Sequence, residues 1–223
     1  MSKRTLMISV LGLMTGVLSH ATPPVWVIDL DDVIEVSSAR YLSDSLEEAS
    51  TSNVPLVVLR IDTPGGWMDS TRDIVKDILA SPVPVAAYVS PEGASATSAG
   101  TYIVYASHVA AMAPATNIGS ATPVRADGEA MEPNLERKVV NDAVAKMRGL
   151  AELRGRNVAW AEKTVREATN LTASEALEQN VIDVMATDIG VLLAKIDGMT
   201  LATKTGSVTL ATKGSEHQVI TNT

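Results

Sequence analysis

Two short segments of the chain carry residue types that together could perform acyl transfer. Residues 62–66 read Asp-Thr-Pro-Gly-Gly and follow an apolar run, so backbone N–H groups without side-chain cover could point into a cleft. Residues 93–100 place small residues around Ser95 and Ser98, which lets a substrate backbone approach a hydroxyl. Acyl transfer requires such a hydroxyl beside N–H groups that hold the developing oxyanion. The two segments therefore suggest a serine nucleophile.

Each segment also has an ordinary structural explanation. Pro-Gly commonly ends a strand in a turn, where glycine tolerates positive φ. A serine just before an apolar helix is commonly its N-cap, and residues 101–106 have the pattern of such a helix. The pattern by itself leaves the turn and cap interpretations open.

Histidine and cysteine chemistry has less support in the sequence. The chain has no cysteine, which excludes both a cysteine nucleophile and a disulfide framework. A Ser-His-Asp triad would need His20 in the N-terminal apolar segment, His217 near the C-terminus, or His108. His108 follows Ser98 by only ten residues and precedes an apolar strand, so it is kept only as a minor alternative.

Acidic residues raise the question of a metal site. Asp29, Asp31 and Asp32 cluster after the first β-rich run, but no histidine or second acidic cluster has ligand spacing. Solvated charges at a strand end are the favoured interpretation, and neither a metal nor a cofactor is expected. The net charge of −8 argues against a nucleic-acid partner, because phosphate binding needs clustered Lys and Arg.

The segments that must position these residues alternate between strand and helix patterns. Runs at residues 25–30, 55–61 and 83–89 predict strands, and residues 37–49 and 70–79 between them have helical spacing. Such alternation with short turns predicts an α/β fold with a mainly parallel sheet flanked by helices. Further predicted elements are a strand at 109–113, a long helix at 134–154, a capped helix from Thr172 to near Asn180, a strand at 181–186, a helix at 189–196 and a hairpin at 201–213.

The chain is expected to divide into three parts. Residues 1–21 have the order of a secretory signal peptide, with Lys3 and Arg4, then a short apolar run, then small residues up to Ala21. The run is short for a membrane span, so cleavage after Ala21 is favoured over a retained anchor. Residues 22–213 are expected to form one domain, and residues 214–223 a disordered tail. An exported protein, periplasmic or otherwise extracytoplasmic, is predicted.

Taken together, the motifs resemble one known family. Residues 62–66, 96–102 and 112–119 occur in the order found in the NfeD-type membrane-associated ClpP-class serine proteases. The likeness continues through Lys138 and residues 155–157, 171–177 and 198–199, and covers roughly residues 25–210. The resemblance implies a ClpP/crotonase-like α/β fold built from repeated β-β-α and βαβ units.

The resemblance assigns a nucleophile and a base. The family's nucleophile lies in a Ser-Ala-Gly segment, which corresponds to Ser98, and its general base is a lysine at the start of the following long helix, which corresponds to Lys138. Ser95 is not followed by Ala-Gly and is interpreted as a loop residue. A lysine acts as a base only when neutral, so its ordinary pKa of about 10.4 must be lowered by burial or nearby positive charge.

The resemblance also implies the rest of the site. The oxyanion hole is expected to use backbone N–H groups of Gly65, Gly66 and Trp67. Apolar substrate contacts are expected from Met68, Tyr102 and Met112, for each of which core packing is an equal alternative.

The family implies partners that composition and spacing do not reveal. These are a homodimer or larger homo-oligomer, a hydrophobic peptide or membrane-protein substrate, and a stomatin-like protein as a candidate for that substrate. Longer relatives continue into membrane helices, and membrane association is one expectation for this chain. Two other functions stay open. One is a crotonase-like acyl-CoA enzyme, although a signal peptide argues against it because coenzyme A is cytoplasmic. The other is a non-catalytic module that assembles stomatin-like membrane complexes.

Overall fold

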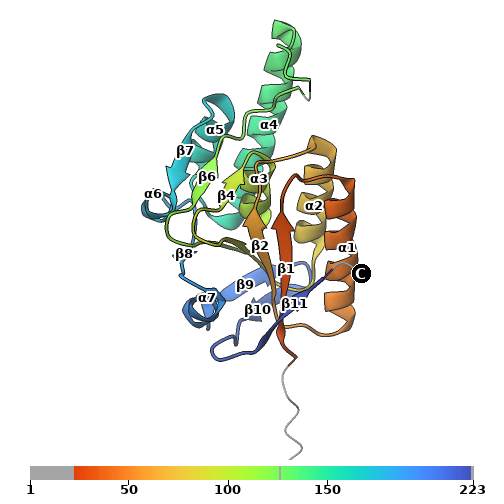
Figure 1. Cartoon of the computed structure of the whole chain (residues 1–223), viewed down its shortest axis with the longest axis vertical. Helices are drawn as coiled ribbons and strands as arrows, with labels where there is room; N and C mark the ends of the chain where they lie inside the picture. Colours follow the sequence, from red (N-terminus) through yellow and green to blue (C-terminus); the bar gives the residue numbers. More distant parts are fainter. Residues whose placement is uncertain (1–22, 126, 222–223) are drawn as a thin grey trace, which may run out of the picture.

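A parallel six-stranded sheet forms the centre of the protein in the computed structural model, which describes residues 23–125 and 127–221 (Figure 1). The predicted signal peptide, residues 1–21, lies outside the described residues. The strand order is β11-β1-β2-β3-β5-β8, and every neighbouring pair is parallel. The strands are β1 (Val25–Asp31), β2 (Val57–Asp62), β3 (Val85–Val89), β5 (Val109–Met112), β8 (Val184–Met185) and β11 (His217–Ile220).

Helices pack against both faces of this sheet. The connections run through α1 (Val36–Thr51), α2 (Met68–Ala80), α3 (Ala99–Ala106), α4 (Pro133–Arg154), α5 (Val158–Arg166), α6 (Ala173–Glu178) and α7 (Ile189–Ile196). Ile28 and Leu59 point toward a core shared with α1 to α5, whereas Val27 and Val58 point toward a second core with α7. Burial on both faces explains why the central strands are continuous apolar runs.

Two small sheets complete the fold. One contains β4 (Ser95–Thr97), β6 (Asn117–Gly119) and β7 (Asn170–Thr172), with β4 and β6 parallel and β6 and β7 antiparallel. The other is an antiparallel hairpin of β9 (Thr200–Thr203) and β10 (Gly206–Thr209), as predicted for this region. The first sheet leads directly into α3 and therefore sets the position of Ser98. The predicted α/β class with a mainly parallel sheet is confirmed.

The predicted disordered tail, residues 214–223, is wrong for its central part. His217–Ile220 forms β11 and pairs with residues 25–28 of β1. Tyr41 Oη also donates a hydrogen bond of 2.6 Å to the carbonyl of Ile220. Three of its four side chains are exposed and Ile220 packs against the main core, so the strand is held mainly by the backbone groups at the edge of β1.

Candidate active site

Ser98 occupies a strained turn between β4 and the N-terminus of α3. Its φ of 51° and ψ of −109° are unusual for a residue with a side chain, and such conformations cost about 1–3 kcal/mol. Although Ser98 is the N-cap residue, its side chain caps no N–H of the helix. The ordinary explanation of a capping serine therefore does not apply. A sharp strand-to-helix turn that presents an uncommitted hydroxyl is the geometry of a nucleophile elbow.

Buried hydrogen bonds hold this turn in place. The N–H of Ser98 donates to the carbonyl of Gly119 at 2.9 Å. Thr101, which is fully buried, places its Oγ1 3.0 Å from the carbonyl of Ala96 and 2.9 Å from that of Gly119. Strand β4, strand β6 and the first turn of α3 are thereby joined beneath Ser98.

The glycine turn after β2 lies directly against Ser98. A Cβ on Gly65 would be 2.8 Å from Ser98 Cβ and 3.3 Å from its Oγ, and φ at Gly65 is +124°. A Cβ on Gly66 would be 2.0 Å from the carbonyl oxygen of Ile34. Both positions require glycine, because the turn is packed against backbone on one side and against the hydroxyl on the other.

Only some N–H groups of the turn are free to bind an oxyanion. The N–H of Gly65 donates to Thr63 Oγ1 at 3.1 Å, and that of Trp67 donates to the Ile34 carbonyl at 2.8 Å. In the described part of the chain, the N–H groups of Gly66 and Ala99 have no acceptor. Of the three predicted donors, Gly66 is therefore the one left available. Ala99 was missed, although the residue after a nucleophile commonly supplies such a donor.

An apolar groove of about 760 Å³ runs from Ser98 between α2 and α4. Met68 and Tyr102 line it, as predicted, together with Trp67, Leu150 and Leu153. Trp67 is 57% exposed and Leu153 is 60% exposed, and large exposed apolar side chains in one concave surface indicate a binding site. We call this surface the apolar groove.

Met112 is not part of the apolar groove. It lies in β5, is fully buried and belongs to the main core. Met112 therefore packs in the core, which was the alternative to a substrate contact. Strand β5 is covered on both faces, so none of its side chains can reach the surface near Ser98.

Lys138 lies on the N-terminal part of α4, which projects beyond the rest of the domain (Figure 1). It is exposed and does not line the apolar groove, whereas Ser98 does. Asp142, one helical turn later on the same face, lines the groove beside Tyr102. A single described chain therefore does not bring the predicted base beside the predicted nucleophile.

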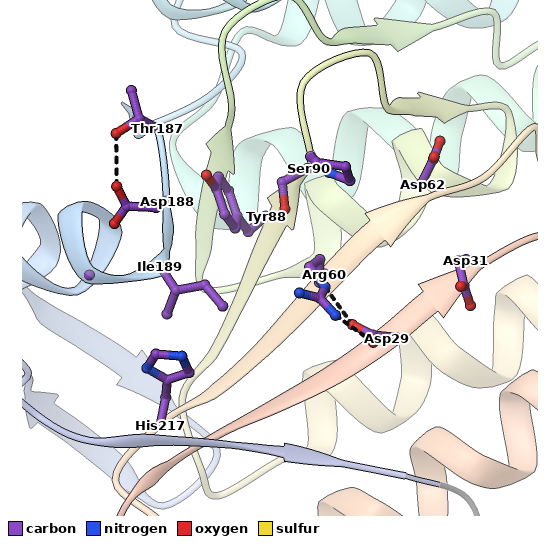
Figure 2. A pocket seen from close by; sticks show the side chains of 12 residues that line it. Asp29, Asp31, Arg60, Asp62, Tyr88, Ser90, Thr187, Asp188, Ile189 and His217 are labelled. Atoms are coloured by element: carbon purple, nitrogen blue, oxygen red, sulfur yellow. Dashed lines mark hydrogen bonds and ion pairs between the residues drawn. The ribbon is translucent and has the colours of Figure 1, made fainter.

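The acidic residues after β1 line a separate hollow of about 800 Å³ on the other face of the sheet (Figure 2). Figure 2 shows Asp29 facing Arg60, whose Nε and Nη2 each donate to its carboxylate at 2.6 Å. His217 lies at the edge of the same hollow, away from Ser98. Across residues 23–125 and 127–221, no group of three or more His, Asp or Glu is placed to hold a metal ion.

His108 is a buried structural residue at the opposite end of α3 from Ser98. An eight-residue helix, about 12 Å long, separates the two. His108 is 7% exposed, and its Nδ1 accepts the N–H of Val85 at 3.1 Å. Burial, assisted by Arg154 and Arg156, lowers the pKa of His108 to about 4. The triad alternative therefore has no geometric support.

This burial predicts a loss of stability in acid. The pKa of His108 is lower in the folded state than in the unfolded state, so its neutral form favours folding above about pH 6.5, and this contribution is lost as pH falls toward 4. We expect the free energy of unfolding, measured in urea, to fall when the pH is lowered from 7.5 to 4.5. The fall should be about 2 kcal/mol larger in the native protein than in His108→Asn. Asparagine retains an acceptor for Val85 but does not titrate. Equal losses in the two proteins would contradict this assignment.

Comparison with known proteins gives consistent matches. The family model for the NfeD1b N-terminal domain matches residues 24–193. Membrane-bound protease PH1510 of Pyrococcus horikoshii is 42% identical over 154 residues, covering 68% of this chain, and membrane protein NfeD1b of Bacillus subtilis is 36% identical over 108 residues, covering 48%. The matched regions span only 34% and 24% of these two relatives.

Solved structures of the 1510-N membrane-bound stomatin-specific protease share the fold. A serine-to-alanine mutant and a lysine-to-alanine mutant in complex with a substrate peptide each have a TM-score of 0.84 and 35% sequence identity. Each match covers 91% of this chain, with 100% and 94% of the respective solved chains. A third structure, of the 1510-N membrane protease specific for a stomatin homolog from Pyrococcus horikoshii, has a TM-score of 0.77 and 35% identity, and the match covers 89% of this chain and 92% of that chain.

Proposed function

Because this chain belongs to the NfeD1b N-terminal domain family, we propose that it is a ClpP-class serine endopeptidase with Ser98 as nucleophile and Lys138 as general base. The observation that carries the proposal is the strained turn at Ser98, which presents a hydroxyl capping no helix N–H beside the free N–H groups of Gly66 and Ala99. One named relative, PH1510, is a membrane-bound protease, and the mutants solved for the 1510-N protease replace a serine and a lysine.

The proposed reaction proceeds through an acyl-enzyme. Lys138 removes the proton of Ser98 Oγ, which attacks the peptide carbonyl carbon, and the resulting oxyanion accepts hydrogen bonds from the N–H groups of Gly66 and Ala99. The C–N bond then breaks, and the proton passes from Lys138 to the leaving amine. Lys138 then deprotonates a water, which attacks the acyl carbon. The bond from that carbon to Ser98 Oγ breaks, the acid product leaves, and Lys138 returns the proton to Oγ. The N-terminus of α3 contributes a favourable dipole at the oxyanion.

The apolar groove supports an apolar peptide as the substrate. Its walls combine Trp67, Met68 and Leu153 with the ring of Tyr102, whose pKa is raised by burial and by Asp142. We assign to it a hydrophobic segment of a membrane protein, with a stomatin-like protein as the leading candidate, because one solved relative is described as stomatin-specific. No helix within the described residues is long and apolar enough to cross a bilayer. Export, which the N-terminal segment predicts, would place the site outside the cytoplasm.

A homo-oligomer would complete the site. Lys138 is one turn from Asp142 on the groove side of α4, but it lies beyond the body of its own chain. Several apolar side chains around the groove are largely exposed, including Trp67, Val124 and Leu153. Association through this surface would cover them, exclude water from the groove and place Lys138 near a Ser98.

The proposal is tested by peptide cleavage in Gly66→Ala. The added Cβ would overlap the Ile34 carbonyl, so the turn must shift and its N–H must leave the oxyanion. We expect kcat for an apolar, stomatin-derived peptide to fall by about 100-fold or more, measured by mass spectrometry of the products. Gly190→Ala is the matched control, because Gly190 lies in α7 beside the separate hollow and a Cβ there would have one close neighbour, the N-cap carboxylate of Asp188 at 3.2 Å. Unchanged cleavage in Gly66→Ala would remove this turn from the mechanism.

A further inference from the structure

Thr63 joins the glycine turn to the strand that carries Ser98. It follows β2 and is fully buried. Its N–H donates to the Ser95 carbonyl at 2.7 Å, and its own carbonyl accepts from the N–H of Thr97 at 3.1 Å. The backbone of Thr63 thus pairs with β4 one residue before the nucleophile, so a displacement of either segment moves the other.

The hydroxyl of Thr63 holds the turn from the inside. Its Oγ1 lies 2.6 Å from the Asp32 carbonyl, to which it donates, and it accepts the N–H of Gly65 at 3.1 Å. The same oxygen is 3.2 Å from the Gly65 carbonyl. One side chain therefore connects the loop after β1 to the turn after β2. The backbone of Ile34 holds the next part of the turn, through the Gly65 carbonyl and the Trp67 N–H.

This arrangement fixes the direction of the Gly66 N–H. The Gly65 carbonyl accepts from the Ile34 N–H at 2.8 Å, and Gly66 N–H belongs to the same peptide unit. In a planar trans peptide the C=O and N–H point in opposite directions, so the Gly66 N–H must point away from Ile34. Thr63 stabilises this orientation by holding the preceding N–H, that of Gly65.

The methyl group of Thr63 supports the second donor. A Cβ on Gly100 would lie 2.8 Å from Thr63 Cγ2, so this methyl sits against the first turn of α3. Ala99, whose N–H is the other free donor, precedes Gly100 in that turn. The two ends of one side chain thus contact the two segments that form the oxyanion hole.

We infer that Thr63 is the positioning residue that aligns the two oxyanion donors with Ser98. Thr63 does not touch substrate and acts through Gly66 and Ala99. This role rests on the proposed function. Because the transition state, but not the bound substrate, places charge on the oxyanion, losing the hydroxyl should lower kcat and leave KM unchanged.

The test compares three substitutions at Thr63 with a remote control. Thr63→Val keeps the shape and removes the hydroxyl, and kcat for an apolar peptide is expected to fall by about 10- to 100-fold with KM within about twofold. Thr63→Ser keeps the hydroxyl and should restore kcat to within about threefold of the native protein. The control is Thr212→Val, which removes another fully buried hydroxyl. This hydroxyl donates to the Leu193 carbonyl at 2.7 Å and is far from Ser98, so kcat should not change. If Thr63→Val does not fold, as judged by circular dichroism, Thr63→Ala is compared with Thr63→Ser, because both lack the methyl group and they differ only in the hydroxyl.

A second readout separates positioning from general loosening of the fold. A peptide aldehyde captured by Ser98 places an oxyanion in the same hole, so its affinity should fall by the same factor as kcat. Binding of the uncleaved peptide, measured in the Ser98→Ala background, should not change. A native kcat in Thr63→Val or Thr63→Ala, or an equal loss in Thr63→Ser, would overturn the inference. If the native protein and Ser98→Ala cleave equally, the proposed function itself is wrong.

Discussion

Replacing Ser98 by alanine is expected to reduce cleavage of an apolar peptide to background, a loss of at least about 10⁴-fold in kcat. The Oγ is the atom that forms the acyl-enzyme, and the nearby hydroxyls of Thr101 and Ser95 are bonded to other groups. Thr101 donates to backbone carbonyls of β4 and β6, and Ser95 donates to Asn117 Oδ1 at 2.7 Å. The measurement is the initial rate of product formation at saturating peptide.

The matched control for this change is Ser95→Ala. Ser95 is three residues earlier in β4, is partly buried and bears the same hydroxyl, but its bond to Asn117 lies within the small sheet. We expect its kcat to stay within about threefold of the native value. If Ser98→Ala binds the peptide normally and the native protein never cleaves it, the chain is a binding module of the kind considered from the sequence.

Replacing Lys138 by alanine is expected to cost at least about 10³-fold in kcat with little effect on peptide affinity. The amine is proposed to move the proton in both halves of the reaction, and general acid–base groups of this kind typically contribute 10²- to 10⁴-fold. Lys163→Ala is the control, because Lys163 is also an exposed lysine on a helix but lies on α5. A native rate in Lys138→Ala would exclude Lys138 as the base.

Mixing the two inactive variants reveals which chain supplies the base. If Lys138 acts on Ser98 of a second copy, hybrids of Ser98→Ala with Lys138→Ala contain one intact site and activity returns. If Lys138 acts within its own chain, every hybrid site lacks one group and activity stays absent. Analytical ultracentrifugation of the same mixtures shows whether hybrids form. A purely monomeric, active protein would remove the proposed oligomer from the mechanism.

Sequence alone determined the fold class and the order of the chemical segments. Buried parallel strands must be apolar on both faces, and the helices between them must be amphipathic, so the alternation of patterns is a local property of the chain. The likeness to NfeD-type proteases depends on short motifs around Ser98 and the glycine turn, and the family model confirms it. The predicted cap at Thr172 is likewise local, because its side chain bonds the N–H of Glu175, three residues away.

The tertiary structure decided which of the candidate groups are available for chemistry. A backbone N–H is free or bonded according to what a distant segment places opposite it, and Ile34 and Thr63 use the N–H groups of Trp67 and Gly65 while leaving that of Gly66. Met112 was indistinguishable from a groove residue until β5 was seen to be covered on both faces. The position of Lys138 depends on the direction in which α4 leaves the body of the domain. No local sequence pattern determines this direction, because it is set by packing between elements far apart in the chain.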